Sequence, residues 1–346
     1  MKYKILTHLL LVIFCSLGVS WAEDETESVR GLKWVDVDKN HPTPFLEGKY
    51  RAIVVGNNAY SDQKGIWKNL KTAVQGAKTV ATLLQNDYGF SDVTLLLDVE
   101  RKEILSALQK LSKRVEPNDS VLVYYAGHGY LEEDHRRGYW IPTDGQGFDN
   151  STFIRNSTTR DEINIIAEKT KHTLLISDSC FSGSLLKAGV RGPRKTENIE
   201  NYYKKVSNKK SVQVLAAGGN EFVDDSYRNS GQSPFTYFFV NELKNNTQRM
   251  ISLSELASNL IKAVANNVEQ TPMMGVLQGA GDELGDFVFA RISGEDNVLE
   301  VVVGRDQSKA QIKQIVNGRL ENKPNKNAKE RAIKSTEPVF FPGFRF

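Results

Sequence analysis

The chain has 346 residues, of which 40% are hydrophobic and 25% are charged. This composition is typical of globular proteins, and the length allows one large domain or two small ones. The formal net charge is only +3, which argues against a nucleic-acid-binding protein, because such a protein usually carries a strong basic excess.

The first 22 residues have the pattern of a secretory signal peptide. Lys2 and Lys4 form a positive start, residues 5–19 are mainly apolar, and Ser20 and Ala22 supply small residues before an acidic run. We therefore predict cleavage after Ala22 and a secreted or periplasmic mature protein. The alternative is an uncleaved membrane anchor, but the apolar run is short for a membrane span, so none is expected in the mature chain.

Cleavage would leave one cysteine in the mature protein. It would remove Cys15 and keep Cys180, and the loss of Lys2 and Lys4 would lower the net charge from +3 to +1. Disulfides form in oxidising compartments, yet Cys180 would have no partner within the chain. A lone thiol in an exported protein favours a reactive role over a structural one.

Predicted strands and helices alternate along the first half of the mature chain, after a polar arm at residues 23–48. Apolar runs predict strands, and an apolar stripe predicts the helix that we expect Gly89 to cap. The order strand–helix–strand–helix–strand indicates a parallel sheet with helices on both faces. These elements are a strand at 50–56, a helix at 72–86, a strand at 93–97, a helix at 101–115 and a strand that begins at Ser120.

The second half is predicted less regularly. We expect an edge hairpin at 138–142, a loop at 145–158, a helix at 161–169, a strand at 174–176, a strand at 212–217, helices at 233–243 and 253–268, and a final strand at 286–290. Residues 187–210 are basic and polar, and predict either a solvated loop or a cleavable activation linker. The polar tail at 292–346 is expected to be flexible or weakly helical.

A histidine and a cysteine follow the ends of two predicted strands. His128 stands just after one apolar run, and Cys180 follows the run Leu174–Ile176. Ligands bind at the carboxyl edge of open α/β sheets, so both side chains are expected at one site. Either residue alone is explained by packing or by a turn, but the pair favours thiol nucleophilic catalysis. Gly127 and Gly129 leave the backbone bare, so an amide N–H can approach a reacting oxygen.

The runs Tyr125–Gly129 (Tyr-Ala-Gly-His-Gly) and Asp178–Gly183 (Asp-Ser-Cys-Phe-Ser-Gly) resemble the motifs of caspase-like cysteine peptidases, closer to metacaspases than to animal caspases. Matches at Ala52–Gly56, Tyr88–Phe90 and Ser233–Thr236 keep the family order. The resemblance implies a three-layer α/β fold for residues 49–291, with a mostly parallel six-stranded sheet and helices on both faces.

The resemblance also implies roles for the site residues of an endopeptidase that acts on peptides or proteins. Cys180 would be the nucleophile, and His128 would be the general base and acid. The backbone N–H groups of Gly129 and Cys180 would form the oxyanion hole.

Metacaspases cleave after Arg or Lys, because carboxylates line the pocket for that side chain. Asp178 matches one of these acids and suits a guanidinium group. Gly76 stands where the family has a second acid, and Asp224 or Asp225 is a candidate to compensate. A basic preference would also make Arg191, Arg194 and Lys195, all within residues 187–210, candidate sites of self-cleavage.

Calcium activates many metacaspases, and Asp144, Asp161 and Glu162 offer oxygen ligands here. However, Lys187 lies where a further acid would help, so we expect no required metal or other cofactor. Two other functions remain open on the sequence: a non-catalytic module of the same fold that binds partners, and a thiol hydrolase or transferase acting on non-peptide acyl groups. The sequence leaves the oligomeric state open.

Overall fold

The structure, a computed structural model, describes residues 47–180, 182–187, 199–219, 223–279 and 281–291, and the backbone of strands at 298–303, 313–316 and 319–322. The predicted signal peptide and all but the last residues of the predicted arm lie outside these residues. Within them, none of the helices has the length and apolar character needed to cross a membrane.

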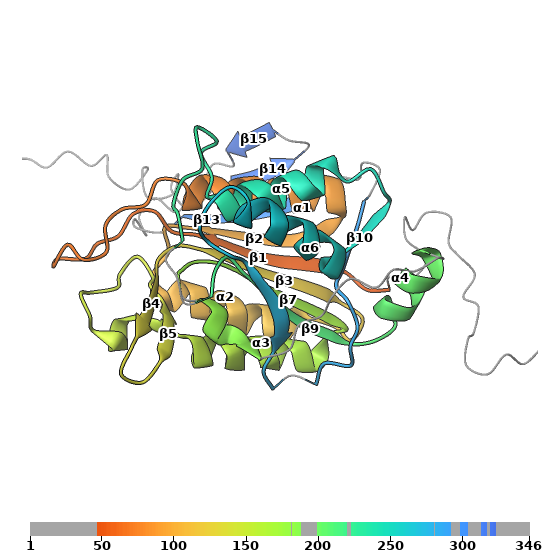
Figure 1. The fold of residues 1–346 in the computed structure, drawn as a ribbon, viewed down its shortest axis with the longest axis horizontal. Coiled ribbons are helices and arrows are strands. Elements are labelled where there is room, and N and C mark those ends of the chain that lie inside the picture. Colours follow the sequence, from red (N-terminus) through yellow and green to blue (C-terminus); the bar gives the residue numbers. More distant parts are fainter. Residues whose placement is uncertain are drawn as a thin grey trace, which may run out of the picture. The chain divides into compact units, whose positions relative to one another are not determined.

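A long mixed sheet forms the centre of the fold (Figure 1). Its strands in the described part of the chain are β1 (Tyr50–Gly56), β2 (Phe90–Leu97), β3 (Ser120–Ala126), β7 (His172–Asp178), β8 (Leu186–Lys187), β9 (Ser211–Ala216), β11 (Met273–Leu277), β13 (Val298–Val303), β14 (Lys313–Val316) and β15 (Arg319–Asn322). They lie in the order β15-β14-β13-β2-β1-β3-β7-β9-β11-β8. The strands from β13 to β9 run parallel, and the outer strands pair antiparallel.

Helices cover both faces of this sheet (Figure 1). One layer contains α1 (Ala73–Tyr88), α5 (Pro234–Asn245) and α6 (Leu253–Ala265), and the other contains α2 (Arg101–Arg114) and α3 (Asn156–Lys169). Strand β1 contributes side chains to the cores on both faces of the sheet, because successive side chains point to opposite faces. Ala52 and Val54 join the first core, and Ile53 and Val55 join the second. The predicted three-layer α/β class is thus confirmed.

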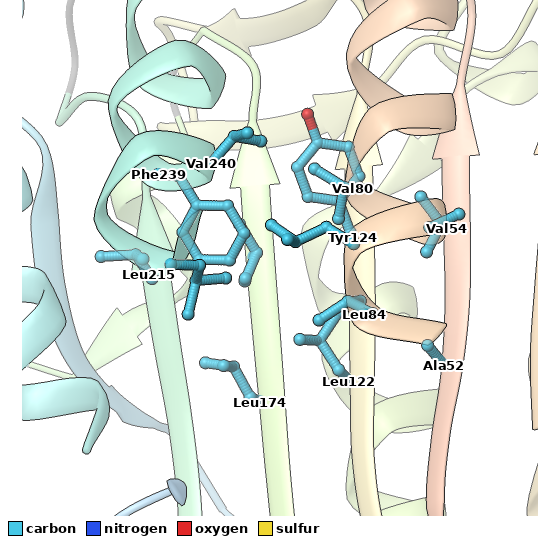
Figure 2. Close-up of a cluster of buried hydrophobic side chains, with 14 of the residues drawn as sticks. Ala52, Val54, Val80, Leu84, Leu122, Tyr124, Leu174, Leu215, Phe239 and Val240 are labelled. Atoms are coloured by element: carbon cyan, nitrogen blue, oxygen red, sulfur yellow. The ribbon is translucent and has the colours of Figure 1, made fainter. Parts of the chain in front are cut away.

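The first core shows how the helices meet the parallel strands. Figure 2 shows Val80 of α1 and Phe239 of α5 beside Leu122, Leu174 and other sheet residues. These four side chains are 0% exposed. Helix α1 runs two residues past its predicted end at residue 86, and Gly89 caps it as predicted, with a left-handed φ of 66° and its N–H bonded to the carbonyl oxygen of Leu84.

Two small sheets flank the main one. Strands β4 (Gly129–Glu132), β5 (Arg137–Trp140) and β6 (Ile154–Arg155) form the first. The hairpin predicted at 138–142 overlaps only β5, and its partner strand β4, which was not predicted, begins directly after His128. Strands β10 (Met250–Ser252) and β12 (Val288–Ala290) form the second. The predicted final strand at 286–290 is therefore shorter and lies outside the main sheet. Strand β11, which the sequence analysis missed, is the antiparallel neighbour of β9; its interior Gly275 weakens the strand signal.

Other predicted boundaries also differ from the structure. Helix α3 begins at Asn156, and the expected loop before it contains the short helix η1 (Asn150–Thr152) and strand β6. The expected linker begins at the last residue of β8 and contains α4 (Ile199–Ser207), where Tyr203 is 3% exposed and donates a hydrogen bond to the carbonyl oxygen of Met250. Tertiary contacts thus stabilise a helix in a segment whose composition suggests a loop.

The C-terminal segment also differs from its prediction as a flexible or weakly helical tail. The run Val-Leu-Glu-Val-Val-Val forms strand β13, which pairs parallel with β2. The polar composition of the whole segment obscures this short β-branched run. Strands β14 and β15 extend the sheet beyond it, whereas Val339–Phe346 lies outside the described residues.

A buried aspartate, Asp119, ties together the amino-terminal ends of three neighbouring strands. Its carboxylate accepts hydrogen bonds from the N–H of Lys49 (2.8 Å) and from Nε of Arg51 (2.6 Å) at β1. Its main-chain carbonyl accepts from the N–H groups of Lys171 and His172 at β7. Because Asp119 directly precedes β3, these bonds fix β1, β3 and β7 in one register.

Replacement of Arg51 tests this anchor. Asp119 is 0% exposed, so Arg51→Ala leaves a buried carboxylate without its guanidinium and should lower the free energy of unfolding by about 3 kcal/mol or more. Arg114→Ala is the matched control, because its side chain is 46% exposed and lies 3.4 Å from Asp92; it should cost less than about 1 kcal/mol. Urea denaturation measures both, and equal losses would contradict the anchoring role.

Candidate active site

The register of β3 and β7 brings the predicted histidine and cysteine to one edge of the sheet. These parallel strands pair from Ser120 and His172 through to Ala126 and Asp178. His128 is two residues beyond Ala126, and Cys180 is two residues beyond Asp178. Both therefore leave the sheet at the same level, at the carboxyl edge where α/β folds bind ligands.

A pocket of about 320 Å³ lies at this edge. It is lined by His128 and Cys180, by the predicted specificity residues Asp178 and Asp224, and by residues of the loop that precedes α1. The described lining residues include no lysine or arginine. The site thus combines a thiol, an imidazole and several carboxylates around one cavity.

His128 is half-buried between two aromatic rings. Its ring centroid lies 4.7 Å from that of Tyr60 and 5.6 Å from that of Trp67. Nε2 lies 2.7 Å from the carbonyl oxygen of Lys68, which can only accept, so Nε2 carries a hydrogen and Nδ1 remains the basic nitrogen of the neutral ring. Burial lowers the pKa of His128, against the opposing effects of the Lys68 carbonyl and Asp225.

Cys180 is a partly exposed free thiol. Burial raises its pKa, and this effect outweighs the backbone N–H of Val223, which donates to Sγ at 3.3 Å. The thiol and the imidazole are therefore both mainly neutral near pH 7. A neutral imidazole can accept the proton of a neutral thiol, which is the general-base form of cysteine activation.

Gly129 lies against the backbone of Cys180. A Cβ atom on Gly129 would lie 2.1 Å from the carbonyl oxygen of Cys180 and 3.1 Å from its nitrogen. The close approach requires glycine at this position. The two backbones that the sequence analysis assigns to an oxyanion hole are thus neighbours.

Asp178 lies in the pocket but is only 7% exposed. Its Oδ2 accepts hydrogen bonds from Ser233 Oγ and Thr236 Oγ1, each at 2.6 Å, and from the hydroxyl of Tyr124 at 3.5 Å. Burial raises the pKa of Asp178 to about 6, although the three hydroxyls oppose the shift. The carboxylate is held by neutral donors, so it is oriented without its charge being neutralised.

The two loop aspartates have different roles in the structure. Asp225 accepts hydrogen bonds from the N–H groups of Lys71 (2.8 Å) and Thr72 (3.3 Å), so it supports the start of α1. Asp224 is exposed, and its own N–H donates to Gln270 Oε1 at 3.2 Å, which leaves its carboxylate facing solvent and the pocket. A Cβ on Gly76 would lie 3.2 Å from Thr236 Cγ2, which is a tight contact, so an acidic side chain at this position would require Thr236 to shift.

The oxygen ligands considered for calcium are engaged elsewhere. Asp144 accepts from the N–H of Arg101 (2.9 Å), Asp161 pairs with Arg160 (3.5 Å) and Glu162 accepts from Gln109 (3.4 Å). Among the described residues, no three His, Cys, Asp or Glu side chains form a group that could hold a metal ion.

Some site residues were not predicted, and others cannot be placed. The sequence analysis assigned Ser233 only to a helix start; it accepts from the N–H of Thr236 at 3.0 Å, as a cap does, and also donates to Asp178. It missed Trp67 and the Lys68 carbonyl, because a loop without a repeating pattern gives no signal for either. The cleavage candidates Arg191, Arg194 and Lys195 lie outside the described residues.

The caspase domain family model matches residues 49–279. This range is about two thirds of the chain, and it includes both His128 and Cys180. The chain therefore belongs to the caspase domain family.

Curated relatives match over a shorter stretch. The chain is 31% identical over 156 residues to "Metacaspase-1A" of Aspergillus terreus, covering 40% of this chain and 37% of that protein. It is 27% identical over 168 residues to "Metacaspase-1" of Candida albicans, covering 42% and 36%. The chain thus spans little more than a third of the length of these relatives. Among solved structures, caspase-1 from Spodoptera frugiperda matches with a TM-score of 0.48 and 15% identity, over 76% of this chain and 98% of that one.

The buried carboxylate predicts a pH-dependent cost in stability. The pKa of Asp178 is raised from 3.8 to about 6 on folding, so the folded state binds the proton more tightly, and stability falls as the pH rises through this range. Asp178→Asn removes this pH dependence. The unfolding free energy of the variant minus that of wild type should therefore rise by about 2 kcal/mol between about pH 4.5 and about pH 8.

Denaturation of both proteins at the two pH values measures this difference. Asp224→Asn is the matched control, because its exposed carboxylate is solvated in the folded and unfolded states, and a much smaller difference is expected. An Asp178→Asn variant destabilised equally at both pH values would contradict the assignment.

Proposed function

We propose that the chain is an exported cysteine endopeptidase that cleaves peptide bonds after Arg or Lys. The observation that carries the proposal is one pocket that joins a partly exposed thiol, an imidazole oriented through Nε2, and a buried carboxylate. Membership of the caspase domain family supports the same reaction class. Export rests on the signal-peptide pattern of residues 1–22, and analysis of the mature N-terminus tests it.

In the proposed reaction, Sγ of Cys180 attacks the carbonyl carbon of the scissile bond while His128 takes the thiol proton. The negative oxygen that forms is stabilised by the N–H groups of Gly129 and Cys180. His128 then gives the proton to the leaving nitrogen, and a thioester remains on Cys180. Water, deprotonated by His128, hydrolyses the thioester and releases the free thiol.

Asp178 is proposed to bind the basic side chain before the scissile bond. Its carboxylate is held in place by three hydroxyls and lacks a cation among the described pocket residues. A guanidinium or ammonium group would supply the missing positive charge in a low-dielectric site, where a charge-assisted hydrogen bond is strong. The exposed Asp224 would add a second negative charge to the pocket.

Peptide cleavage by defined variants tests the dyad and the specificity together. Cys180→Ala and His128→Ala should each abolish turnover, because the pair acts as a unit. Wild type should cleave peptides with Arg at the cut in preference to those with Gln, and Asp178→Asn should lower kcat/KM for the Arg peptide about a hundredfold with little effect on the Gln peptide.

The same assay includes EDTA and calcium arms, because the proposal requires no metal. Turnover by Cys180→Ala would overturn the dyad. A wild type that prefers neutral or acidic peptides would overturn the role of Asp178. Tight binding of peptides without cleavage would favour the partner-binding alternative, and cleavage of acyl esters alone would favour the non-peptide hydrolase.

We also propose self-cleavage between β8 and α4. Strand β8 ends at Lys187 and α4 begins at Ile199, and the segment between them contains Arg191, Arg194 and Lys195. Such an enzyme would find its preferred bonds there. Intact-mass analysis of purified wild type should give fragments with ends in this segment, absent from Cys180→Ala and from a variant with all three residues replaced by Ala. A wild-type chain that stays whole while fully active would rule out obligatory cleavage.

A further inference from the structure

A group of aromatic side chains beside His128 has no role in the reaction described above. The ring of Trp67 lies 5.6 Å from that of His128, 5.9 Å from that of Tyr130 and 6.3 Å from that of Phe148. Tyr130 and Phe148 lie 5.7 Å apart. Trp67, Tyr130 and Phe148 are called the aromatic platform below.

The aromatic platform is partly open to solvent. Phe148 is 61% exposed and the neighbouring Ile66 is 37% exposed, whereas Trp67 and Tyr130 are half-buried. Beneath them Phe153 is 2% exposed and contacts both Trp67 and Tyr130. The core is therefore complete without Phe148, and exposed apolar surface beside a pocket is typical of a binding site.

The two loops that carry Trp67 and Phe148 are fixed by one carboxylate. Asp62 accepts hydrogen bonds from the N–H groups of Ile66 (2.7 Å), Trp67 (3.0 Å) and Gly147 (2.9 Å). The indole Nε1 of Trp67 in turn donates to the carbonyl oxygen of Gly147 at 2.7 Å. The Trp67 ring and the loop that leads into Phe148 are thus held in position before any ligand arrives, which reduces the entropy lost on binding.

The platform adjoins the pocket on the histidine side. Ile66 and Trp67 line the pocket, whereas Tyr130 and Phe148 do not, so the rings lead from His128 to the surface outside it. In the proposed reaction His128 must come within about 3 Å of the leaving nitrogen to protonate it. The residue that carries this nitrogen therefore lies next to the histidine ring, within reach of Trp67.

We propose that the aromatic platform is a subsite for an apolar or aromatic side chain on the residue immediately after the scissile bond. This inference rests on the proposed peptidase function. The preferred cleavage site is then a basic residue followed by an apolar one: the carboxylate of Asp178 selects the first, and Trp67, Tyr130 and Phe148 select the second by stacking and by burial of apolar surface.

A peptide series that varies only the residue after the cut tests the subsite. Every peptide carries Arg before the bond, and the next residue is Gly, Asp, Leu or Phe. Wild type should cleave the Phe and Leu peptides with a kcat/KM about tenfold above that of the Gly peptide, a difference in the range that apolar pockets provide. The Asp peptide should be the poorest substrate.

Variants separate this subsite from a general loss of activity. Phe148→Ala should lower the Phe-to-Gly ratio about fivefold or more, and Phe148→Tyr should restore it. Ile165→Ala is the control, because Ile165 is a 43% exposed apolar residue on α3, outside the pocket lining, and its ratio should match wild type.

The outcomes distinguish the two proposals. Cleavage of the whole series at one rate, a preference for Gly or Asp, or an unchanged ratio in Phe148→Ala would overturn the subsite and leave the peptidase function standing. Absence of cleavage of every peptide by wild type would overturn the peptidase function and the subsite with it.

Discussion

The shared register of β1, β3 and β7 is the constraint on which the candidate site depends. Asp119 fixes that register at the amino-terminal edge through its carboxylate and its main-chain carbonyl. At the opposite edge, the same pairing sets Ala126 beside Asp178. A slip of one residue would turn every side chain of a strand to the other face. The anchor at one edge therefore determines whether His128 and Cys180 meet at the other.

Asp178 shows how the site is maintained at a cost to the fold. A buried carboxylate held only by hydroxyls is less favourable than one paired with a cation, and the raised pKa of Asp178 expresses that cost. Natural proteins accept such costs at functional sites. Helix α5 contributes directly, because its capping residue Ser233 bonds both to the helix and to Asp178. The Ser233 side chain thus both caps α5 and holds Asp178 in the wall of the pocket.

The sequence predicts features that local patterns encode. Short apolar runs marked the parallel strands β1, β2, β3, β7 and β9, Gly89 marked the end of α1, and strand ends marked the positions of His128 and Cys180. It could not predict contacts between distant segments: α4 is stabilised by Tyr203, and Trp67 is positioned by Asp62 and Gly147. The prediction of strand β11 failed for a local reason, because its interior Gly275 weakens the sequence pattern of a strand.

An affinity label tests most directly whether Cys180 reacts with a bound basic residue. The purified mature protein would be incubated with two peptidyl acyloxymethyl ketones that differ only in carrying Arg or Asp at the reacting residue, and the intact mass and labelled peptide would be determined. We expect one adduct from the Arg reagent, located on Cys180, and a much slower reaction with the Asp reagent. Equal labelling by both reagents, or no labelling of Cys180 by the Arg reagent, would contradict a thiol nucleophile beside an acidic pocket.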